Sequence, residues 1–489
     1  MQQLTGLDEM FLSLDTGRTT GHVAGIAFFD KRAEPRDEVA FLRARVADRL
    51  TRLPVLRWRL HGAPLGIDGR YWVDGPVDLH EHVVGIRLPR PGTQAQLHAV
   101  IDKIMGTLLP RDLPMWRIFV IEGLEDGRFV YVIKMTHGLA DGSVLWMLFD
   151  QLSDHPSEEL PEVPMSAEPR GGGAEMFARG LLGLMNKPAK GLRLQADAIK
   201  WAAGKLRSDG PGFVPDSLAR MVPGELSKPI TALANKRRGP GEPKVGPFLP
   251  SLAPPMSPFN GTVTANLGLV YYDFALADLR KVGKIVGGTI NDAALAITAG
   301  ALRAYMAENG GIIDRPLITS TPVSWRSGDE KERFANHIFM LFQPLATHLA
   351  DPMERLKFAR ETALSAKANW DGLPTHLTRR ASEWMPSFTL GPMMKVMSFI
   401  PGQYVPKTFN VSVSNVKGPK DKPFYGGAEM QRYVVYGFLS TGSGLLIGGQ
   451  SLGDRMVFSA TICKDIVTHY EDLPRHLHDA LAELLALAD

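Results

Sequence analysis

Residues 129–152 read FVYVIKMTHGLADGSVLWMLFDQL, and this stretch gives the clearest indication of the fold. Its first part, Phe129 to Met135, is apolar, β-branched and aromatic, which predicts a buried strand. Residues 136–142 are small and polar, and from Ser143 onward the apolar residues recur at helical spacing. His137 and Asp141 therefore stand four residues apart, where a buried strand gives way to a helix. Loops held by rigid elements commonly carry reactive side chains.

A second apolar run precedes this strand. Residues 116–122 read as another strand, and Gly123 to Gly127 joins the two with an Asp-Gly step. Two apolar runs separated by a short glycine-containing loop predict a β-hairpin. We therefore expect residues 116–122 and 129–135 to pair as antiparallel neighbours.

The chemistry available to His137 follows from its imidazole. The unperturbed pKa of histidine lies near neutrality, so its ring can take a proton from a hydroxyl and return it to a leaving group. Asp141 can either orient the ring or lock the loop through a basic partner. The alternative is a half-buried structural histidine with Asp141 capping the next helix, where Ser143 would serve about as well. These residues alone leave both interpretations open.

Several ordered motifs resemble a single family. The H-x-x-x-D-G pattern after a strand resembles the active-site signature of the CoA-dependent acyltransferases, which include chloramphenicol acetyltransferase and the condensation domains of peptide synthetases. The flanking segments resemble the bacterial wax ester synthase/diacylglycerol acyltransferase family, and the likeness covers most of the chain except roughly residues 156–245. The matching segments are 4–30, Pro114-Met115-Trp116, Asn291-Asp292, 321–326, 335–345, 351–356 and 410–419.

The chain departs from that family at one position of the motif. The family usually has two adjacent histidines, and here Thr136 takes the place of the first. Threonine can hydrogen-bond or pack, but it does not titrate. The second histidine matches His137, so the group that the family uses as a base is retained.

The length of 489 residues exceeds what one hydrophobic core usually serves, so we expect two domains. Residues 1–155 form the first and carry the His137 motif. Residues 156–261 read as a linker and basic crossover region, with segments rich in proline and glycine at both ends. Residues 262–489 form the second domain.

The crossover contains a basic amphipathic stretch, Met176 to Arg207, which we expect Pro188 to break. Two interpretations remain. The stretch is either a pair of helices packed on the protein with a solvated basic face, or a surface that lies on an anionic membrane or lipid droplet.

Composition limits the function classes. A net charge of +3 is too small to indicate nucleic-acid binding, and the single cysteine, Cys463, excludes an internal disulfide and fits a reducing compartment. The sequence lacks an uncharged apolar run of 18 residues and the features of a signal peptide. We expect a cytoplasmic protein, with peripheral attachment to membranes or lipid droplets left open by the basic stretch.

Other histidines favour structural roles. His22 precedes an apolar run and is expected to be a structural residue at a strand start. His80 and His82 would face one side of a strand by alternation, which is a feature of metal sites. A third ligand at a familiar spacing is missing, so the sequence does not predict a metal site.

The resemblance implies an α/β fold of two domains, chloramphenicol-acetyltransferase-like, with mixed sheets and an interdomain channel. It implies O-acyl transfer from a long-chain acyl-CoA to diacylglycerol, to a fatty alcohol or to both. Acyl-CoA is then a co-substrate and no metal or redox cofactor is needed. The implied catalytic residues are His137, as general base, and Asp141. The residues implied around the bound substrates are Thr136, Gly138, Gly142, Trp116, Asn291, Ser412, Ser414 and Asn415.

Two rival functions stay open. A carrier-dependent condensation or polyketide-associated acyltransferase would use the same histidine on a carrier-bound acyl group. A catalytically weakened lipid-binding relative is the rival of a different class, with Thr136 as the sign of decay. The joint retention of His137, Asp141 and Gly142 argues against the second rival.

Overall fold

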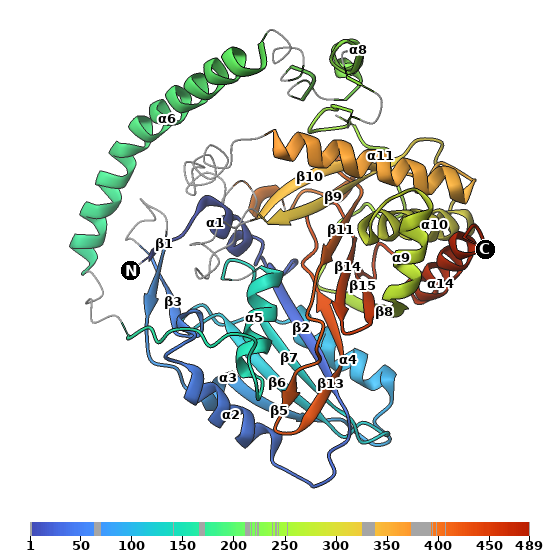
Figure 1. Cartoon of the computed structure of the whole chain (residues 1–489). Coiled ribbons are helices and arrows are strands. Elements are labelled where there is room, and N and C mark those ends of the chain that lie inside the picture. The colour runs from blue at the N-terminus through green and yellow to red at the C-terminus, as the bar shows by residue number, and fades with distance from the viewer. Residues whose placement is uncertain are drawn as a thin grey trace.

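The computed structural model describes residues 2–62, 70–139, 141–165, 172–210, 216–324, 338–372 and 393–488, except positions 217, 221, 223, 237, 240, 241, 243, 252, 394, 398 and 406. Two six-stranded mixed sheets dominate it, with helices packed against both (Figure 1). A small three-stranded sheet lies at the edge of the N-terminal half.

The first large sheet has the order β12-β13-β2-β7-β6-β5, and its neighbours are antiparallel except for the parallel pair β5 and β6. Its strands are β2 (His22–Phe29), β5 (Val83–Arg87), β6 (Trp116–Glu122), β7 (Phe129–Thr136), β12 (Phe424–Tyr425) and β13 (Ala428–Tyr436). The predicted hairpin is confirmed, because β6 and β7 are antiparallel neighbours in the register Trp116↔Met135. Gly127 turns the connecting loop with a φ of 77°.

The central strand β7 is buried on both faces, which explains why its sequence is apolar on both faces except at Lys134 and Thr136. Tyr131 and Ile133 face one core, which helices α2 (Glu38–Arg49) and α5 (Gly142–Leu152) complete. Val130 and Val132 face a second core under α4 (Gln94–Gly106). The strand therefore fixes where its last residues, and the loop after them, must lie.

The second large sheet has the order β10-β9-β11-β14-β15-β8, with β11 parallel to both of its neighbours. Its strands are β8 (Leu267–Ala275), β9 (Leu317–Ser324), β10 (Ile338–Leu345), β11 (Val411–Val416), β14 (Leu445–Leu452) and β15 (Arg455–Cys463). A single apolar core joins one face of this sheet to its helices. These helices are α9 (Leu276–Ile285), α10 (Ile290–Glu308), α11 (Pro352–Asp371) and α14 (Leu473–Leu485).

The two sheets share chain segments, so their boundary does not follow the sequence. Strands β12 and β13 come from the C-terminal half but extend the N-terminal sheet beside β2. Arg432 on β13 forms a salt bridge with Asp273 on β8, and Lys464 pairs with Asp102 on α4 at 2.7 Å. The core under α4 also includes Leu269 of β8 and Val457 of β15. The halves are therefore packed and paired with each other.

The small sheet has the order β1-β4-β3, and a short helix lies between it and β5. The elements of this region are β1 (Gln2–Gln3), α1 (Gly6–Ser13), η1 (Pro54–Leu56), β3 (Trp58–His61), β4 (Tyr71–Asp74) and α3 (Leu79–His82). The prediction for His80 and His82 is wrong, because they lie on α3 and not on a strand. Helical geometry turns His82 into the core and leaves His80 exposed.

The crossover region is a long helix followed by shorter elements. Helix α6 (Gly173–Asp209) runs for 37 residues along the periphery of the molecule (Figure 1). The predicted break at Pro188 is wrong, since the helix continues past it; losing one backbone hydrogen bond there is outweighed by the turns on either side. Among the described residues, the other short helices are η4 (Gly224–Ser227), α8 (Lys228–Lys236), η6 (Gly402–Tyr404) and η7 (Tyr470–Asp472).

Within the described ranges, no single helix is long and apolar enough to cross a membrane. By length and composition alone, α9 and α10 would pass that test together, as a pair bent by 92°.

Candidate active site

His137 follows the last residue of β7 and its backbone is held in place. Its N–H donates to the carbonyl of Gly21 at 2.8 Å, and the N–H of Leu139 donates to the carbonyl of Thr136 at 3.0 Å. Thr136 in turn pairs with His22 across the β2–β7 ladder. His137 is only 7% exposed. The loop is therefore fixed by backbone hydrogen bonds to the strand that runs beside it.

Two aromatic rings hold the imidazole of His137, and they come from opposite halves of the chain. Phe11 on α1 stacks on it with ring centroids 4.0 Å apart and an angle of 17°. Phe438, just after β13, meets it edge-on at 5.0 Å and 87°. A ring held between two aromatic walls has its orientation set by packing, as a proton-transfer group requires.

Asp141 is the N-cap of α5, as one of the two interpretations of the sequence predicted. Its Oδ1 accepts the Ser143 N–H at 3.0 Å, the Val144 N–H at 3.1 Å and the Ser143 hydroxyl at 2.6 Å. Asp141 is 3% exposed. It therefore fixes the start of α5 and the end of the His137 loop. The pairing of Asp141 with an arginine stays a prediction.

The two glycines of the motif lie where other elements come close. A Cβ on Gly138 would lie 3.1 Å from the carbonyl oxygen of Asp8 on α1. A Cβ on Gly142 would lie 3.9 Å from Val416 Cγ2 at the end of β11. The motif is therefore packed between α1 and the last residue of a strand from the other sheet.

The approach of β11 determines where its polar residues lie. Ser412 and Ser414 share a strand face with Val416 by alternation, so they lie on the side that approaches Gly142. Ser412 is buried and Ser414 is half-buried. Asn415 belongs to the opposite face, with Val411 and Val413 in the core of the second sheet. The structure thus brings the serine face, and not that of Asn415, towards the motif.

Trp116 is a structural support. It is fully buried, its Nε1 donates to the Leu56 carbonyl at 2.8 Å, and its ring stacks on His82 at 4.3 Å. The residue before it, Met115, accepts the backbone N–H of Thr136 at 3.0 Å. Trp116 therefore anchors the strand end beside the motif, and Thr136 is wholly buried at that contact.

Asn291 lies in the first turn of α10, half-buried. Thr289 is the N-cap of that helix, and Asp292 accepts its N–H at 2.7 Å. Asp292 also lies 3.3 Å from Arg360 on α11. No hydrogen bond between described residues connects Asn291 to His137, so its proximity to the motif stays a prediction.

A buried polar cluster beside the motif was not predicted. His22, at the start of β2, is fully buried with its Nε2 3.3 Å from Asp15 Oδ2. Lys134 on β7 is 1% exposed and donates to the Ile104 carbonyl at 2.6 Å and to that of Thr107, at the C-terminal end of α4. Burial lowers the pKa of Lys134 from 10.5 to about 7. The N-terminal signature at 4–30 contains Phe11, Asp15 and His22, which is the sequence signal that could have indicated them.

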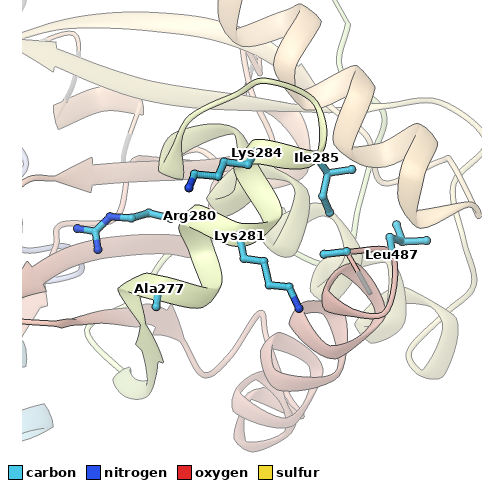
Figure 2. Close-up of a pocket in the computed structure, with 7 residues that line it drawn as sticks. Ala277, Arg280, Lys281, Lys284, Ile285 and Leu487 are labelled. Carbon is cyan, nitrogen blue, oxygen red and sulfur yellow. The ribbon is translucent and has the colours of Figure 1, made fainter.

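A separate concave surface of about 650 Å³ lies between α9 and the C-terminal end. Arg280, Lys281 and Lys284 line it, but in Figure 2 the side chain of Lys281 points away from those of Arg280 and Lys284. They therefore do not converge on a shared anion. Over the described part of the chain, no group of three or more His, Cys, Asp or Glu side chains is placed to hold a metal ion.

Comparisons with known proteins agree with this geometry. The wax ester synthase/diacylglycerol acyltransferase catalytic domain matches residues 4–294, and the C-terminal domain of the same family matches residues 334–485. The chain is 27% identical to the O-acyltransferase WSD of Acinetobacter baylyi, over 98% of this chain and 96% of that protein. It is 28% identical to a protein of Mycobacterium tuberculosis described as a probable diacylglycerol O-acyltransferase, over 98% and 97%.

Solved structures show the same fold. The wax ester synthase/diacylglycerol acyltransferase of Marinobacter aquaeolei VT8 superposes with a TM-score of 0.66 at 23% identity, over the full length of both chains. The starter condensation domain of rhizomide synthetase superposes with a TM-score of 0.53 at 13% identity, covering 100% of this chain and 94% of that one. The predicted two-domain α/β fold is thereby confirmed. This chain belongs to the wax ester synthase/diacylglycerol acyltransferase family.

Proposed function

We propose that the protein transfers a long-chain acyl group from acyl-CoA to the hydroxyl of diacylglycerol, of a fatty alcohol or of both, with His137 as general base. The observation that carries the proposal is the placement of His137. Its backbone is fixed to Gly21, just before β2, and its ring is held between Phe11 and Phe438 where the two halves of the chain meet. The family membership and the activities described for the relatives support the reaction class.

The reaction requires one proton to move twice. His137 removes the proton from the acceptor hydroxyl as its oxygen attacks the thioester carbonyl. A tetrahedral oxyanion forms, the carbon–sulfur bond then breaks, and the protonated imidazole returns the proton to the departing thiolate. General base catalysis of this kind typically contributes 10²–10⁴-fold. The sequence of steps needs no covalent acyl-enzyme.

Hydrogen-bond donors near the oxyanion would lower the barrier further. The hydroxyls of Ser412 and Ser414 are the candidates, because they share the face of β11 that approaches Gly142. Asp141 contributes by holding the loop and the start of α5. Its carboxylate therefore supports the position of His137 rather than taking part in proton transfer.

The decisive experiment measures ester formation by the purified protein with labelled palmitoyl-CoA and either dioleoylglycerol or hexadecanol. The His137→Ala variant is assayed in parallel, with His80→Ala, which removes an exposed histidine on α3, as a matched control. We expect wild type and His80→Ala to form product, His137→Ala to lose about 10²–10⁴-fold of the rate, and the better acceptor to define the substrate class. Absence of product from folded wild-type protein that still binds acyl-CoA would instead support a carrier-dependent enzyme or a lipid-binding protein.

We propose in addition that the enzyme works at an anionic lipid surface, which it contacts through α6. Seven large apolar residues of this helix are 39–69% exposed: Leu182 and a series of six, Phe177, Leu181, Met185, Leu192, Ile199 and Leu206. The spacing of four, four, seven, seven and seven residues places the series of six along one side, here called the outward stripe. Met176, about a quarter turn or more away, is buried instead.

Positive charge follows one edge of the outward stripe. Arg193, Lys200 and Arg207 each follow a stripe residue by one position, and all three are exposed. An exposed helix with an apolar face edged by cations is typical of proteins that lie in the interface of anionic membranes. The substrates in the proposed reaction are themselves lipids, so contact with a lipid surface brings the enzyme to its acceptor.

Sedimentation with vesicles tests the lipid contact. We expect binding to vesicles of phosphatidylcholine with 30% phosphatidylglycerol, weaker binding to pure phosphatidylcholine, and a further decrease as salt screens the charges. The double variant Leu192→Ser/Ile199→Ser should lose binding. Leu226→Ser, which changes an exposed leucine outside α6, is the matched control. Equal binding by the double variant and wild type would contradict the assignment to α6.

A further inference from the structure

We propose that Asp15, in the loop between α1 and β2, is a positioning residue for His137, and that His22 holds the Asp15 carboxylate in its working orientation. This inference rests on the proposed role of His137 as the base. It assigns a task to the N-terminal segment 4–30, whose residues take no direct part in the proton transfer described above.

The connection runs through a single residue, Gly21. Asp15 Oδ1 accepts the backbone N–H of Gly21 at 2.8 Å. The carbonyl of Gly21 accepts the backbone N–H of His137 at 2.8 Å. The carboxylate and the proposed base are therefore joined by two short hydrogen bonds, and the Asp15 side chain is only 2% exposed. A displacement of Gly21 would be passed directly to His137.

Gly21 also determines how close helix α1, which carries Phe11, lies to the His137 loop. A Cβ on Gly21 would lie 2.2 Å from the carbonyl oxygen of Phe11, so the residue just before β2 passes α1 too closely for any side chain. The Phe11 ring is stacked on His137. Asp15 thus fixes the segment that carries both the backbone anchor and one wall of the imidazole.

The surrounding charges keep Asp15 ionised and oriented. Its second oxygen, Oδ2, lies 3.3 Å from His22 Nε2 and 3.9 Å from Arg111 Nη2. Lys134 on β7, whose pKa is about 7, also interacts electrostatically with Asp15. Burial raises the pKa of Asp15, but His22, the Gly21 N–H and Arg111 outweigh it, and the net pKa lies below the ordinary value. Burial lowers the pKa of His22 below its ordinary value, against the raising effect of the Asp15 carboxylate.

The hydrogen bonds of Asp15 do more than stabilise the fold, because they lead to the backbone of His137. A buried carboxylate that only stabilises the fold has no such connection to the loop that carries the base. Asp154 supplies the comparison. It accepts the N–H groups of Gly426 at 2.7 Å and Gly427 at 2.9 Å and pairs with Arg45. It lies just beyond the far end of α5, which begins beside the motif. Loss of Asp154 should affect folding without affecting turnover by the molecules that fold.

The experiment compares Asp15→Ala, Asp15→Asn and Asp154→Ala in the acyl-transfer assay, with rates expressed per folded molecule and Tm measured for each. We expect Asp15→Ala to lower kcat about 10- to 100-fold while KM for acyl-CoA stays within about threefold. Asp15→Asn keeps an oxygen to accept the Gly21 N–H, so it should recover most of that kcat. Asp154→Ala should lower Tm and leave kcat within about twofold.

The outcomes separate this inference from the proposed function. If folded Asp15→Ala has a normal kcat while His137→Ala is inactive, the positioning role is wrong and the base assignment stands. If Asp15→Asn is as poor as Asp15→Ala, the link through Gly21 is wrong. If His137→Ala keeps full activity, the proposed role of His137 as general base is wrong, whatever the Asp15 variants show. His22→Asn, which removes the ring beside Oδ2, should lower kcat less than Asp15→Ala and more than Asp154→Ala.

Discussion

Helices α5 and α6 use similar apolar residues at similar spacing and place them in opposite surroundings. Val144, Leu145 and Leu148 of α5 are each 1% exposed, packed on the sheet beside the His137 loop. Leu192 and Ile199 of α6 are 67% and 69% exposed. The amphipathic pattern predicts that one side of a helix is apolar. It does not say whether that side faces a protein core or a lipid surface.

The two helices differ in exposure because they follow different kinds of segment in the chain. Helix α5 starts at Asp141, at the end of a strand buried on both faces, so its direction and its packing face are already determined. Helix α6 starts after a segment rich in proline and glycine and lies at the periphery (Figure 1). We therefore expect mutations in α5 to lower the stability of the protein, and mutations in the outward stripe of α6 to lower its binding to lipid.

Leu145→Ala should give the largest loss of stability. The side chain is buried between α5 and the first sheet, and truncating such a leucine typically costs about 2–5 kcal/mol. Urea unfolding followed by circular dichroism measures the change. A loss below about 1 kcal/mol would mean that α5 is less firmly packed than the structure indicates.

Gly21→Ala should cause the second largest loss of stability. Its Cβ would meet the carbonyl oxygen of Phe11 at 2.2 Å, so α1 or β2 must shift, which typically costs about 1–3 kcal/mol and moves the residues around His137. Gly204→Ala is the control on α6, where a Cβ meets nothing within 4 Å. We expect the control to gain up to about 1 kcal/mol from helix propensity. Equal effects of the two substitutions would contradict the close approach at Gly21.

Lys134 should make stability depend on pH. Its pKa is about 7 in the folded protein and 10.5 when exposed, so between these values the unfolded chain holds a proton that the folded chain has released. Stability therefore rises with pH across that window by about 1.4 kcal/mol per unit from this group. Unfolding of wild type and Lys134→Met at pH 7.5 and 9 measures the difference in slope. Lys200→Met on the exposed face of α6 should leave the slope unchanged.

Leu192→Ala should have the smallest effect on stability. The side chain is 67% exposed, so its truncation should change the free energy of unfolding by less than about 0.5 kcal/mol. Its affinity for anionic vesicles should fall because apolar surface is lost from the outward stripe. A stability loss like that of Leu145→Ala would show that α6 packs against protein in solution, and would remove the basis for the lipid contact.

Local pattern predicted some parts of the site well. The hairpin of β6 and β7 followed from two apolar runs and a glycine loop, and capping by Asp141 was one of the two interpretations that its place before a helical pattern left open. Both depend on interactions between near neighbours. Pro188 and the His80/His82 pair were misjudged because a local rule was outweighed: the helix continues past the proline, and a short helix replaces the expected strand.

Long-range contacts could not be predicted in this way. Phe11 and Phe438 are separated by 427 positions in the sequence, yet both touch the ring of His137. The insertion of β13 into the N-terminal sheet, which brings Phe438 there, leaves no periodic signal. Asp15 and His22 lie only a few residues apart, but their connection to the motif depends on the pairing of β2 with β7.

The sequence by itself determined that a histidine follows a buried strand, that a helix begins a few residues later, and that residues 176–207 form a basic amphipathic segment. These features follow from side-chain periodicity and capping, which act over a few residues. The tertiary structure alone decided which rings hold His137, which peptide anchors it, and that the apolar side of α6 faces outward. These depend on which surfaces of distant segments meet, because burial of apolar area favours close packing without specifying partners along the chain.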